Sequence, residues 1–289
     1  MRQPAQLIAD CGSTKCDWLV DAANIRTEVL ETTGFSPFFH TAAEIEHILR
    51  SELLPQLGDR PVLTVWFYGT GVHDAYRAGV VREAMQRVFP VAAVSVEHDL
   101  LAAARAACGH SAGIACILGT GSNSCLFDGQ RIVDNVPSLG WLLGDEGSGT
   151  YLGRALLRAW FYRELPPELA AAFTVAFPES ESRIKDRVYA KGGNAYLAGF
   201  SGFLGDHVSH PFVQAMLRQA FDAFLDAHVV KYAGYRDLPV HFVGSIAYHY
   251  RVELAACLHA RGLQLGTVIQ KPIRALQSYH HTLQENTKP

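Results

Sequence analysis

A loop of small and polar residues follows the first apolar segment of the chain, residues 6–9. Its members are Asp10, Cys11, Gly12, Ser13, Thr14 and Lys15. Small residues let backbone N–H groups approach an anion closely, and the hydroxyls and the Lys15 ammonium can donate to phosphate oxygens. The Asp10 carboxylate suits Mg²⁺, which takes few protein ligands besides water and substrate phosphates. The loop therefore predicts a phosphate and magnesium site, although a plain β-turn has a similar composition and no GxxxxGK[ST] P-loop or GxGxxG motif occurs.

Two further loops have a similar character. Apolar residues 114–118 end in Gly119, Thr120, Gly121 and Ser122, and the strand-like residues 240–243 end in Gly244 and Ser245. A loop of the first type in each half of the chain favours a two-sided phosphate clamp over coincidental turns. A nucleotide can rest on the N-terminus of the helix that follows Gly244 and Ser245, although this pair alone is also typical of an ordinary N-cap.

Residues 140–149 combine one tryptophan, two acids and four glycines. Asp145 and Glu146 stand just before a helical segment, where acids stabilise a helix N-terminus. Capping accounts for one acid but not for Trp141 or the glycines. Carboxylates that accept from hydroxyls beside an aromatic face are a common way to hold sugars, so this segment predicts a polyol site.

Asp99 follows strand-like residues 92–96 and precedes the alanine-rich helical segment 100–108. The position is typical of an N-cap, which is the interpretation that the residues alone favour. A carboxylate at a strand end of an α/β protein can also accept the proton of a hydroxyl during phosphoryl transfer.

The segments that position these loops alternate between strand and helix patterns, which predicts an α/β protein. A strand that runs into a Gly/Ser/Thr loop and opens a hairpin occurs twice, first at residues 6–20 and again at residues 114–127. The second hairpin is extended around Asp128-Gly129, a strong turn signal. This restart predicts a duplicated architecture with a boundary near residues 109–113.

Length and composition narrow the class of protein. The 289 residues are about twice a typical domain, and 49% hydrophobic with 18% charged residues is a globular composition. A net charge of −3 gives no electrostatic basis for binding nucleic acid or an anionic membrane. No signal peptide or membrane-spanning run is recognised, and the six cysteines form no CxxC motif. We therefore expect reduced thiols in a cytoplasmic, two-domain protein.

Together these motifs resemble the ASKHA superfamily of sugar kinases, hexokinase, Hsp70 and actin, and within it the BadF/BadG/BcrA/BcrD-type ATPase family, which includes N-acetylglucosamine kinases. The most specific matches are residues 117–124 (ILGTGSNS) and 143–149 (LGDEGSG). The resemblance implies two RNase H-like α/β domains around a nucleotide cleft. The first would be residues 1–110, joined by a C-terminal helix at 273–289, and the second residues 111–272.

The resemblance also implies ATP and Mg²⁺ as cofactors and a role for each candidate residue. Asp10 would hold the metal ion and Asp99 would be the catalytic base. The phosphates would be bound by Gly12, Ser13, Thr14, Lys15, Gly119, Thr120, Gly121 and Ser122, and the adenosine by Gly244 and Ser245. The residues near the sugar would be Ser36, Thr70, Asn123, Trp141 and Asp145. Ser36 stands where related chains often carry the Asn of a Gly-x-Asn-Pro motif, and Cys11 where they often carry Ser or Gly.

The predicted function is an ATP-dependent kinase that phosphorylates a hydroxyl of an amino sugar, with N-acetylglucosamine as the first candidate and glucosamine and N-acetylmuramic acid as the others. The expected partner is this sugar, without nucleic acid or membrane, and a homodimer is common among relatives. Two alternatives are an ATPase that activates a partner reductase through an iron–sulfur cluster, and a non-catalytic sugar sensor. Cys116 and Cys125 bracket the second phosphate loop on its strands, which favours buried structural cysteines over cluster ligands.

Overall fold

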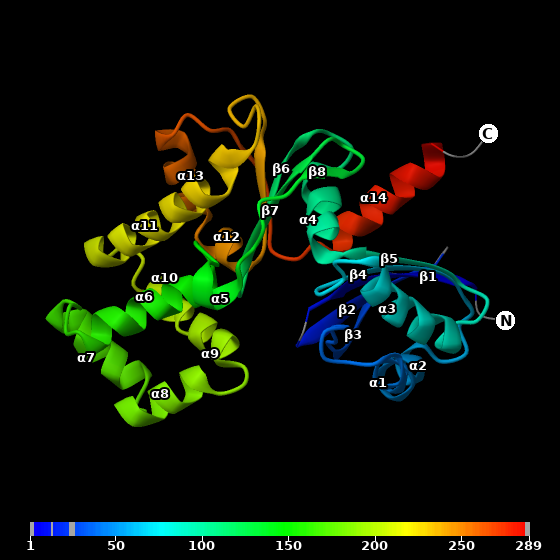
Figure 1. Ribbon diagram of the computed structural model, residues 1–289, viewed down its shortest axis with the longest axis horizontal. Helices are drawn as coiled ribbons and strands as arrows, with labels where there is room; N and C mark the ends of the chain where they lie inside the picture. The colour runs from blue at the N-terminus through cyan, green and yellow to red at the C-terminus, as the bar shows by residue number, and fades with distance from the viewer. Residues whose placement is uncertain (1–2, 13, 23–26, 287–289) are drawn as a thin grey trace. The chain divides into compact units, whose positions relative to one another are not determined.

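The computed structural model describes residues 3–12, 14–22 and 27–286, and the chain divides into two compact units (Figure 1). Unit 1 comprises Met1–His110 and Pro272–Pro289, and unit 2 comprises Ser111–Lys271. Each unit contains a five-stranded sheet. In the described part of the chain, no helix is long and apolar enough to cross a membrane.

The sheet of unit 1 has the strand order β3-β2-β1-β4-β5. Its strands are β1 (Ala5–Cys11), β2 (Lys15–Asp21), β3 (Glu28–Thr33), β4 (Val62–Gly69) and β5 (Ala93–His98). The first three strands are antiparallel neighbours, whereas β1, β4 and β5 run parallel. The carboxyl ends of these parallel strands therefore lie at one edge of the sheet, where α/β proteins commonly bind ligands.

Helices cover both faces of this sheet. They are α1 (Ala42–Ile48), η1 (Leu49–Leu53), α2 (Leu54–Leu57), α3 (Ala75–Val88), α4 (Asp99–Cys108) and α14 (Ile273–Asn286). Because side chains alternate along a strand, Leu7 packs in the core with α1, η1 and α3, while Ile8 packs in the core with α4 and α14. Unit 1 is thus completed by a helix that follows unit 2 in the sequence.

The helical segment over residues 42–57 is interrupted. Thr41 begins α1 with a capping box to Glu44, and η1 is a π-helical turn in which the Leu54 N–H bonds to the Leu49 carbonyl. Pro55 has no N–H to donate to the preceding turn, so the regular α pattern cannot run through this position.

The sheet of unit 2 has the order β10-β9-β6-β7-β8. Its strands are β6 (Gly113–Leu118), β7 (Ser122–Phe127), β8 (Ile132–Asp134), β9 (Val240–Val243) and β10 (Leu265–Ile269). Strand β6 is antiparallel to β7 and parallel to β9, as β1 is to β2 and β4. Both sheets therefore have the same topology, which confirms the α/β fold that the repeated sequence pattern predicted.

The helices of unit 2 outnumber those of unit 1 and contribute to one large apolar core. They are α5 (Gly140–Leu143), α6 (Gly149–Phe161), α7 (Pro167–Ala176), α8 (Glu181–Tyr189), α9 (Gly193–Gly199), α10 (Ser201–Asp206), α11 (Pro211–Ala227), η2 (Val229–Lys231), α12 (Ser245–His249) and α13 (Arg251–Ala260). Helices α12 and α13 meet at Tyr250, whose side chain is buried in the core.

Candidate active site

Three of the predicted site residues lie at the carboxyl edge of the sheet in unit 1. The register pairs Cys11 with Gly69 and Gly69 with His98, so the ends of β1, β4 and β5 are adjacent. The Thr70 N–H donates to the Cys11 carbonyl at 3.0 Å. Asp10, Thr70 and Asp99 therefore occupy the ends of three neighbouring parallel strands.

The first predicted phosphate loop is a tight connection between β1 and β2. The Gly12 N–H donates to the Lys15 carbonyl at 2.9 Å, and Gly34 N–H donates to the Thr14 carbonyl at 3.0 Å. A Cβ on Gly34 would lie 2.2 Å from the Gly12 carbonyl oxygen, so only glycine fits there without a shift of the backbone. Ser13 lies outside the described residues.

Lys15 forms ion pairs with two carboxylates of the same sheet. Its Nζ lies 3.2 Å from Asp17 Oδ1 and also contacts the Glu31 carboxylate. The hydrogen bond with Glu31 is the main cause that raises the pKa of Lys15 to about 12. Lys15 therefore remains a cation. In this structure its ammonium group is paired with two acids of its own sheet.

Ser36 is buried in the turn after β3, beside the turn after β4. Its hydroxyl accepts from the Phe38 N–H at 3.4 Å, and its carbonyl accepts from His40 N–H at 3.0 Å. A Cβ on Gly71 would lie 2.3 Å from Ser36 Oγ. The structure thus places Ser36 against the segment that carries Thr70.

Asp99 is the first residue of α4, and the N-cap of that helix is His98 rather than Asp99. His98 Nδ1 accepts from the Leu100 N–H at 3.1 Å, and it lies 3.0 Å from Asp99 Oδ1. The ring centroid of His73 is 4.5 Å from that of His98. The capping interpretation of Asp99 is therefore wrong, and its carboxylate is left with an imidazole neighbour.

The second predicted phosphate loop connects β6 to β7 and is anchored on α6. The Gly149 N–H donates to the Gly119 carbonyl at 2.8 Å, and the Thr150 N–H donates to the Thr120 carbonyl at 3.1 Å. No atom lies within 4 Å of a Cβ built on Gly119. Ser122 Oγ is buried and has no hydrogen-bond partner among the described residues. An open loop with an unpaired hydroxyl donor fits a phosphate oxygen.

Asp145 lies directly beneath this second loop. Its Oδ1 accepts from the Ser122 N–H at 3.1 Å and from the Ser138 hydroxyl at 3.4 Å, and a Cβ on Gly121 would lie 2.9 Å from Oδ2. Asp145 has a left-handed backbone with φ of 58°. Burial raises the pKa of its carboxyl group. The N-cap of α6 is Ser148, so helix capping does not account for Asp145.

Gly244 closes the same edge of the unit 2 sheet. Its φ is 125°, and a Cβ would lie 2.3 Å from the Leu118 carbonyl oxygen, so the turn after β9 needs glycine. Ser245 is exposed at the first position of α12. Gly244 therefore lies against the strand end that opens the second phosphate loop.

Asn123 and Trp141 complete the predicted residues of unit 2. Asn123 Oδ1 accepts from the Ser124 N–H at 2.9 Å and from Asn135 Nδ2 at 3.3 Å. Trp141 is half-buried in α5, and its carbonyl accepts from Arg154 Nη1 at 2.6 Å. This bond fixes the short helix that precedes Asp145.

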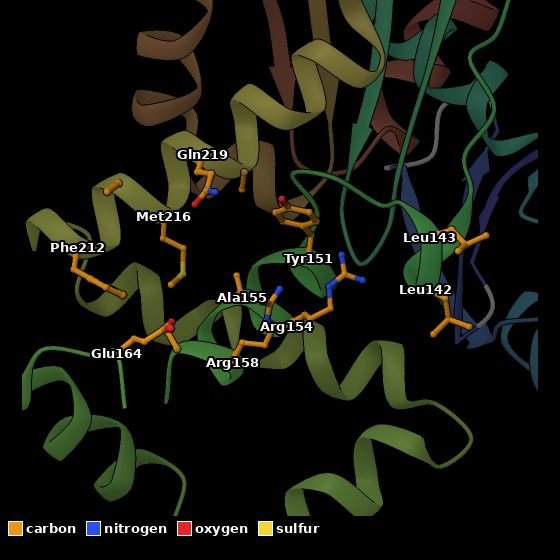
Figure 2. Close-up of a pocket in the computed structure, with 13 residues that line it drawn as sticks. Leu142, Leu143, Tyr151, Arg154, Ala155, Arg158, Glu164, Phe212, Met216 and Gln219 are labelled. Atoms are coloured by element: carbon orange, nitrogen blue, oxygen red, sulfur yellow. The ribbon is translucent and has the colours of Figure 1, made fainter. Parts of the chain in front are cut away.

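Unit 2 contains a groove of about 580 Å³. Figure 2 shows side chains from α6 and α11 projecting into it. It is lined in part by Arg154, Arg158, Glu164, Phe212 and Met216. None of the sequence-predicted site residues lines it, so the groove is separate from the second phosphate loop.

Sequence reasoning missed three residues that position the predicted site residues but belong to no recognised motif. Gly34 and Gly71 allow the close approaches in unit 1, and His98 contacts Asp99. Gly34 stands two residues before Ser36, at the glycine position of the Gly-x-Asn-Pro motif, so the sequence contained a usable signal for it. The only sequence signal for His98 was its position next to Asp99.

The two units share one sheet topology, and each has a glycine-containing loop at the carboxyl edge of its sheet. This arrangement defines the ASKHA class of actin-like and hexokinase-like folds. A ROK hexokinase from Thermus thermophilus has this fold with a TM-score of 0.53 and 14% identity, over 96% of this chain and 99% of that chain.

Two other solved structures are more similar. A protein of Porphyromonas gingivalis, described as a proposed N-acetylglucosamine kinase, is 43% identical with a TM-score of 0.91, over 96% of this chain and 98% of its own. A protein of Chromobacterium violaceum with the same description is 20% identical with a TM-score of 0.74, over 96% and 99%. The chain belongs to the BadF-type, N-acetylglucosamine kinase-like family. Comparisons with protein-family models and with curated proteins gave no match.

Proposed function

We propose that the protein is an ATP-dependent sugar kinase whose acceptor is an amino sugar, with N-acetylglucosamine as the first candidate. The observation that carries the proposal is the placement of Asp99 at the end of β5, on the same sheet edge as Asp10 at the end of β1. The 43% identity to a proposed N-acetylglucosamine kinase over 96% of the chain supports the choice of acceptor.

Asp99 would accept the proton of the sugar hydroxyl as its oxygen attacks the γ-phosphorus of ATP. The bond between that phosphorus and the bridging oxygen breaks, and ADP leaves with the electron pair. The loops that contain Gly12 and Gly119, with the Ser122 hydroxyl, would bind phosphate oxygens. Asp10 is the residue that would hold Mg²⁺, which neutralises phosphate charge when bound.

The residues proposed to hold the sugar offer complementary hydrogen-bonding groups. Thr70 and Ser36 carry hydroxyls, Asn123 carries an amide, and the Asp145 carboxylate can accept from sugar hydroxyls. Trp141 offers an aromatic surface of the kind that packs against sugar rings. This set suits a polyol with an acetamido or amino group better than an anionic acceptor, because Asp145 is a carboxylate.

The test is a coupled assay of ADP formation with Mg-ATP and a panel of hexoses and amino sugars. We expect turnover that depends on an amino sugar, and a fall of about 10²–10⁴-fold in kcat for Asp99→Asn with nucleotide binding retained. Asp59→Asn, which changes an exposed carboxylate of the same unit, is the matched control and should leave kcat unchanged.

Other outcomes would support other functions. Equal kcat in wild type and Asp99→Asn would remove Asp99 from the role of base. ADP formation without any sugar dependence would favour an ATPase that activates a partner, and sugar binding without turnover would favour a sensor. All six cysteines fall within the described residues, where they are buried and none is in a disulfide, as expected of structural thiols.

A further inference from the structure

The side-chain amide of Asn123 is held by its oxygen. On β7, Asn123 Oδ1 accepts from the Ser124 N–H at 2.9 Å and from Asn135 Nδ2 at 3.3 Å. A carbonyl oxygen has two lone pairs, so these two donors use its capacity to accept. Asn123 is half-buried, and its Nδ2 has no hydrogen-bond partner in the part of the chain that the structure describes. The amide therefore presents N–H donors, and no acceptor, to a molecule that binds beside it.

The opposite orientation of this amide is unfavourable. It would place the NH₂ group of Asn123 against the Ser124 N–H and the NH₂ group of Asn135, so that donors would face donors. Asn135 cannot turn over in response, because its Nδ2 also donates to the Ser124 carbonyl at 2.6 Å and to the Val136 carbonyl at 3.1 Å. Its two N–H groups serve three oxygens, so one of them is shared. Asn135 thus helps to decide which end of the Asn123 amide is free.

The segment that carries Asn135 is fixed to β7 by buried side chains. The Val136 N–H donates to the Tyr232 hydroxyl at 3.1 Å. Ser124 Oγ lies 2.6 Å from that hydroxyl and 3.0 Å from His228 Nδ1, and all three side chains are buried. These bonds join groups of the chain itself, so the orientation of the amide is set before a ligand binds.

We propose that Asn135 acts through Asn123 as a positioning residue that makes the sugar site select an acetamido group over a free amino group. This inference rests on the proposed function, in which Asn123 lies near the sugar. The carbonyl oxygen of an acetamido group can accept from Asn123 Nδ2. A free amino group of a sugar is largely an ammonium near pH 7, which has N–H donors and no lone pair. Donors would then face each other, and a site built to donate a hydrogen bond rejects such a ligand.

Glucose separates this polarity from the size of the acetyl group. Glucose and glucosamine both lack that group, but a hydroxyl of glucose can accept from Asn123 Nδ2 whereas the ammonium cannot. A site that merely has room for an acetyl group would bind the two alike. Titration calorimetry at pH 7 should give glucosamine a dissociation constant about fivefold or more above that of glucose, with N-acetylglucosamine the tightest of the three.

The decisive variant is Asn123→Asp. One carboxylate oxygen can still accept from the Ser124 N–H and from Asn135 Nδ2, so the variant keeps the hydrogen bonds of the hairpin. The other oxygen replaces the free NH₂ group and can accept from an ammonium. We expect glucosamine to bind about tenfold more tightly than to wild type, and so more tightly than glucose, while N-acetylglucosamine binds about tenfold more weakly.

Asn135→Ala tests the positioning role without changing the residue proposed to contact the sugar. It removes one of the two donors to Asn123 Oδ1 and leaves that oxygen able to accept from a ligand. The ratio of the dissociation constants of glucosamine and glucose should fall by about two- to fivefold. A variant that only loosened the segment would weaken the binding of all three sugars alike and leave this ratio at its wild-type value, which would overturn the role of Asn135.

Gln130→Glu is the matched control. Gln130 is exposed in the turn between β7 and β8, so this change also converts an amide to an acid on the same hairpin. It should leave all three dissociation constants unchanged. Thermal unfolding of the three variants checks that each is folded at the temperature of the titration.

Two results would overturn the role of Asn123 while leaving the proposed kinase intact. One is tighter binding of glucosamine than of glucose by wild type, which attraction of the ammonium by the Asp145 carboxylate would explain. The other is the same order of these two sugars in Asn123→Asp as in wild type. Failure of the proposed function has a different signature, in which wild type binds none of the three sugars and forms ADP without them, and the inference then fails with it.

Discussion

Asp145 combines a left-handed backbone with a buried carboxylate that supports the second phosphate loop. Asp145→Asn should fold normally, because asparagine tolerates positive φ and its side-chain oxygen can still accept from the Ser122 N–H. The loss of charge should weaken hydrogen bonds from sugar hydroxyls by about 1–1.5 kcal/mol, which raises the sugar KM about tenfold. Steady-state kinetics and thermal unfolding test this directly.

Asp145→Ala separates support of the loop from sugar binding. This change leaves the Ser122 N–H without its partner and should cost about 1–3 kcal/mol of stability. If Asp145→Asn lowers Tm as much as Asp145→Ala while the KM stays at the wild-type value, Asp145 only supports the loop.

At the residue scale, the sequence indicated which side chains could react, but it did not indicate all of their hydrogen-bond partners. Asp99 and His98 are both able to cap a helix, and only the backbone register decides that His98 does so. The bond from Ser122 N–H to Asp145 spans 23 positions in the sequence, so composition could not predict it. The roles assigned to Asp10, Asp99 and the sugar-binding residues remain predictions.

The β1–β2 connection depends on a close approach by the segment after β3. Gly34→Ala would place a Cβ 2.2 Å from the Gly12 carbonyl oxygen and 2.3 Å from Lys15 N, and both are backbone atoms that cannot rotate away. We expect a loss of about 2–4 kcal/mol in the free energy of unfolding and a weaker affinity for ATP. Urea denaturation and nucleotide titration measure the two effects.

Gly79→Ala is the control for this exchange. Gly79 lies inside α3, and no heavy atom lies within 4 Å of a Cβ built there. Because alanine favours the helix over glycine by up to about 1 kcal/mol, this variant should be as stable as wild type or more so. Equal stability of Gly34→Ala and wild type would show that the loop adjusts without cost.

At the element scale, the repeated strand, loop and hairpin were predictable because apolar runs and Gly-rich turns are local signals. The shared topology of the two sheets confirms that prediction. The sequence pattern did not reveal the π-helical turn at η1 or the separation of α12 from α13 at Tyr250, because buried apolar residues recur at helical spacing on both sides of each change. Tertiary packing and the missing N–H of Pro55 decide where those helices change.

At the scale of the whole molecule, buried histidines make stability depend on pH. Burial, with the nearby Arg105 cation, lowers the pKa of His280 from 6.5 to about 4. Between these values the unfolded chain binds a proton that the folded chain does not, so stability falls as the pH drops from about 6.5 to 4. His280 alone accounts for at most about 3 kcal/mol, and urea unfolding at pH 7, 5.5 and 4.5 measures the change.

His280→Phe isolates this contribution. Phenylalanine can retain the stack on Trp66, and Tyr68 keeps its hydrogen bond from Arg105 at 2.8 Å. The variant should lose less stability on acidification than wild type. Part of the pH dependence should persist, because burial also lowers the pKa of His228 and His241. The same acid sensitivity in the variant and wild type would contradict the assignment.

The return of α14 to unit 1 has a consequence for protein synthesis. Ile8, Leu19 and Tyr68 share a core with Ile273 and Leu276. The sheet of unit 1, which is translated before unit 2, therefore keeps one apolar face incompletely covered until α14 is translated. Unit 2, which is continuous in sequence, can complete its own core before that moment. Chains that stop before residue 273 should therefore be preferred clients of chaperones that bind exposed apolar surface.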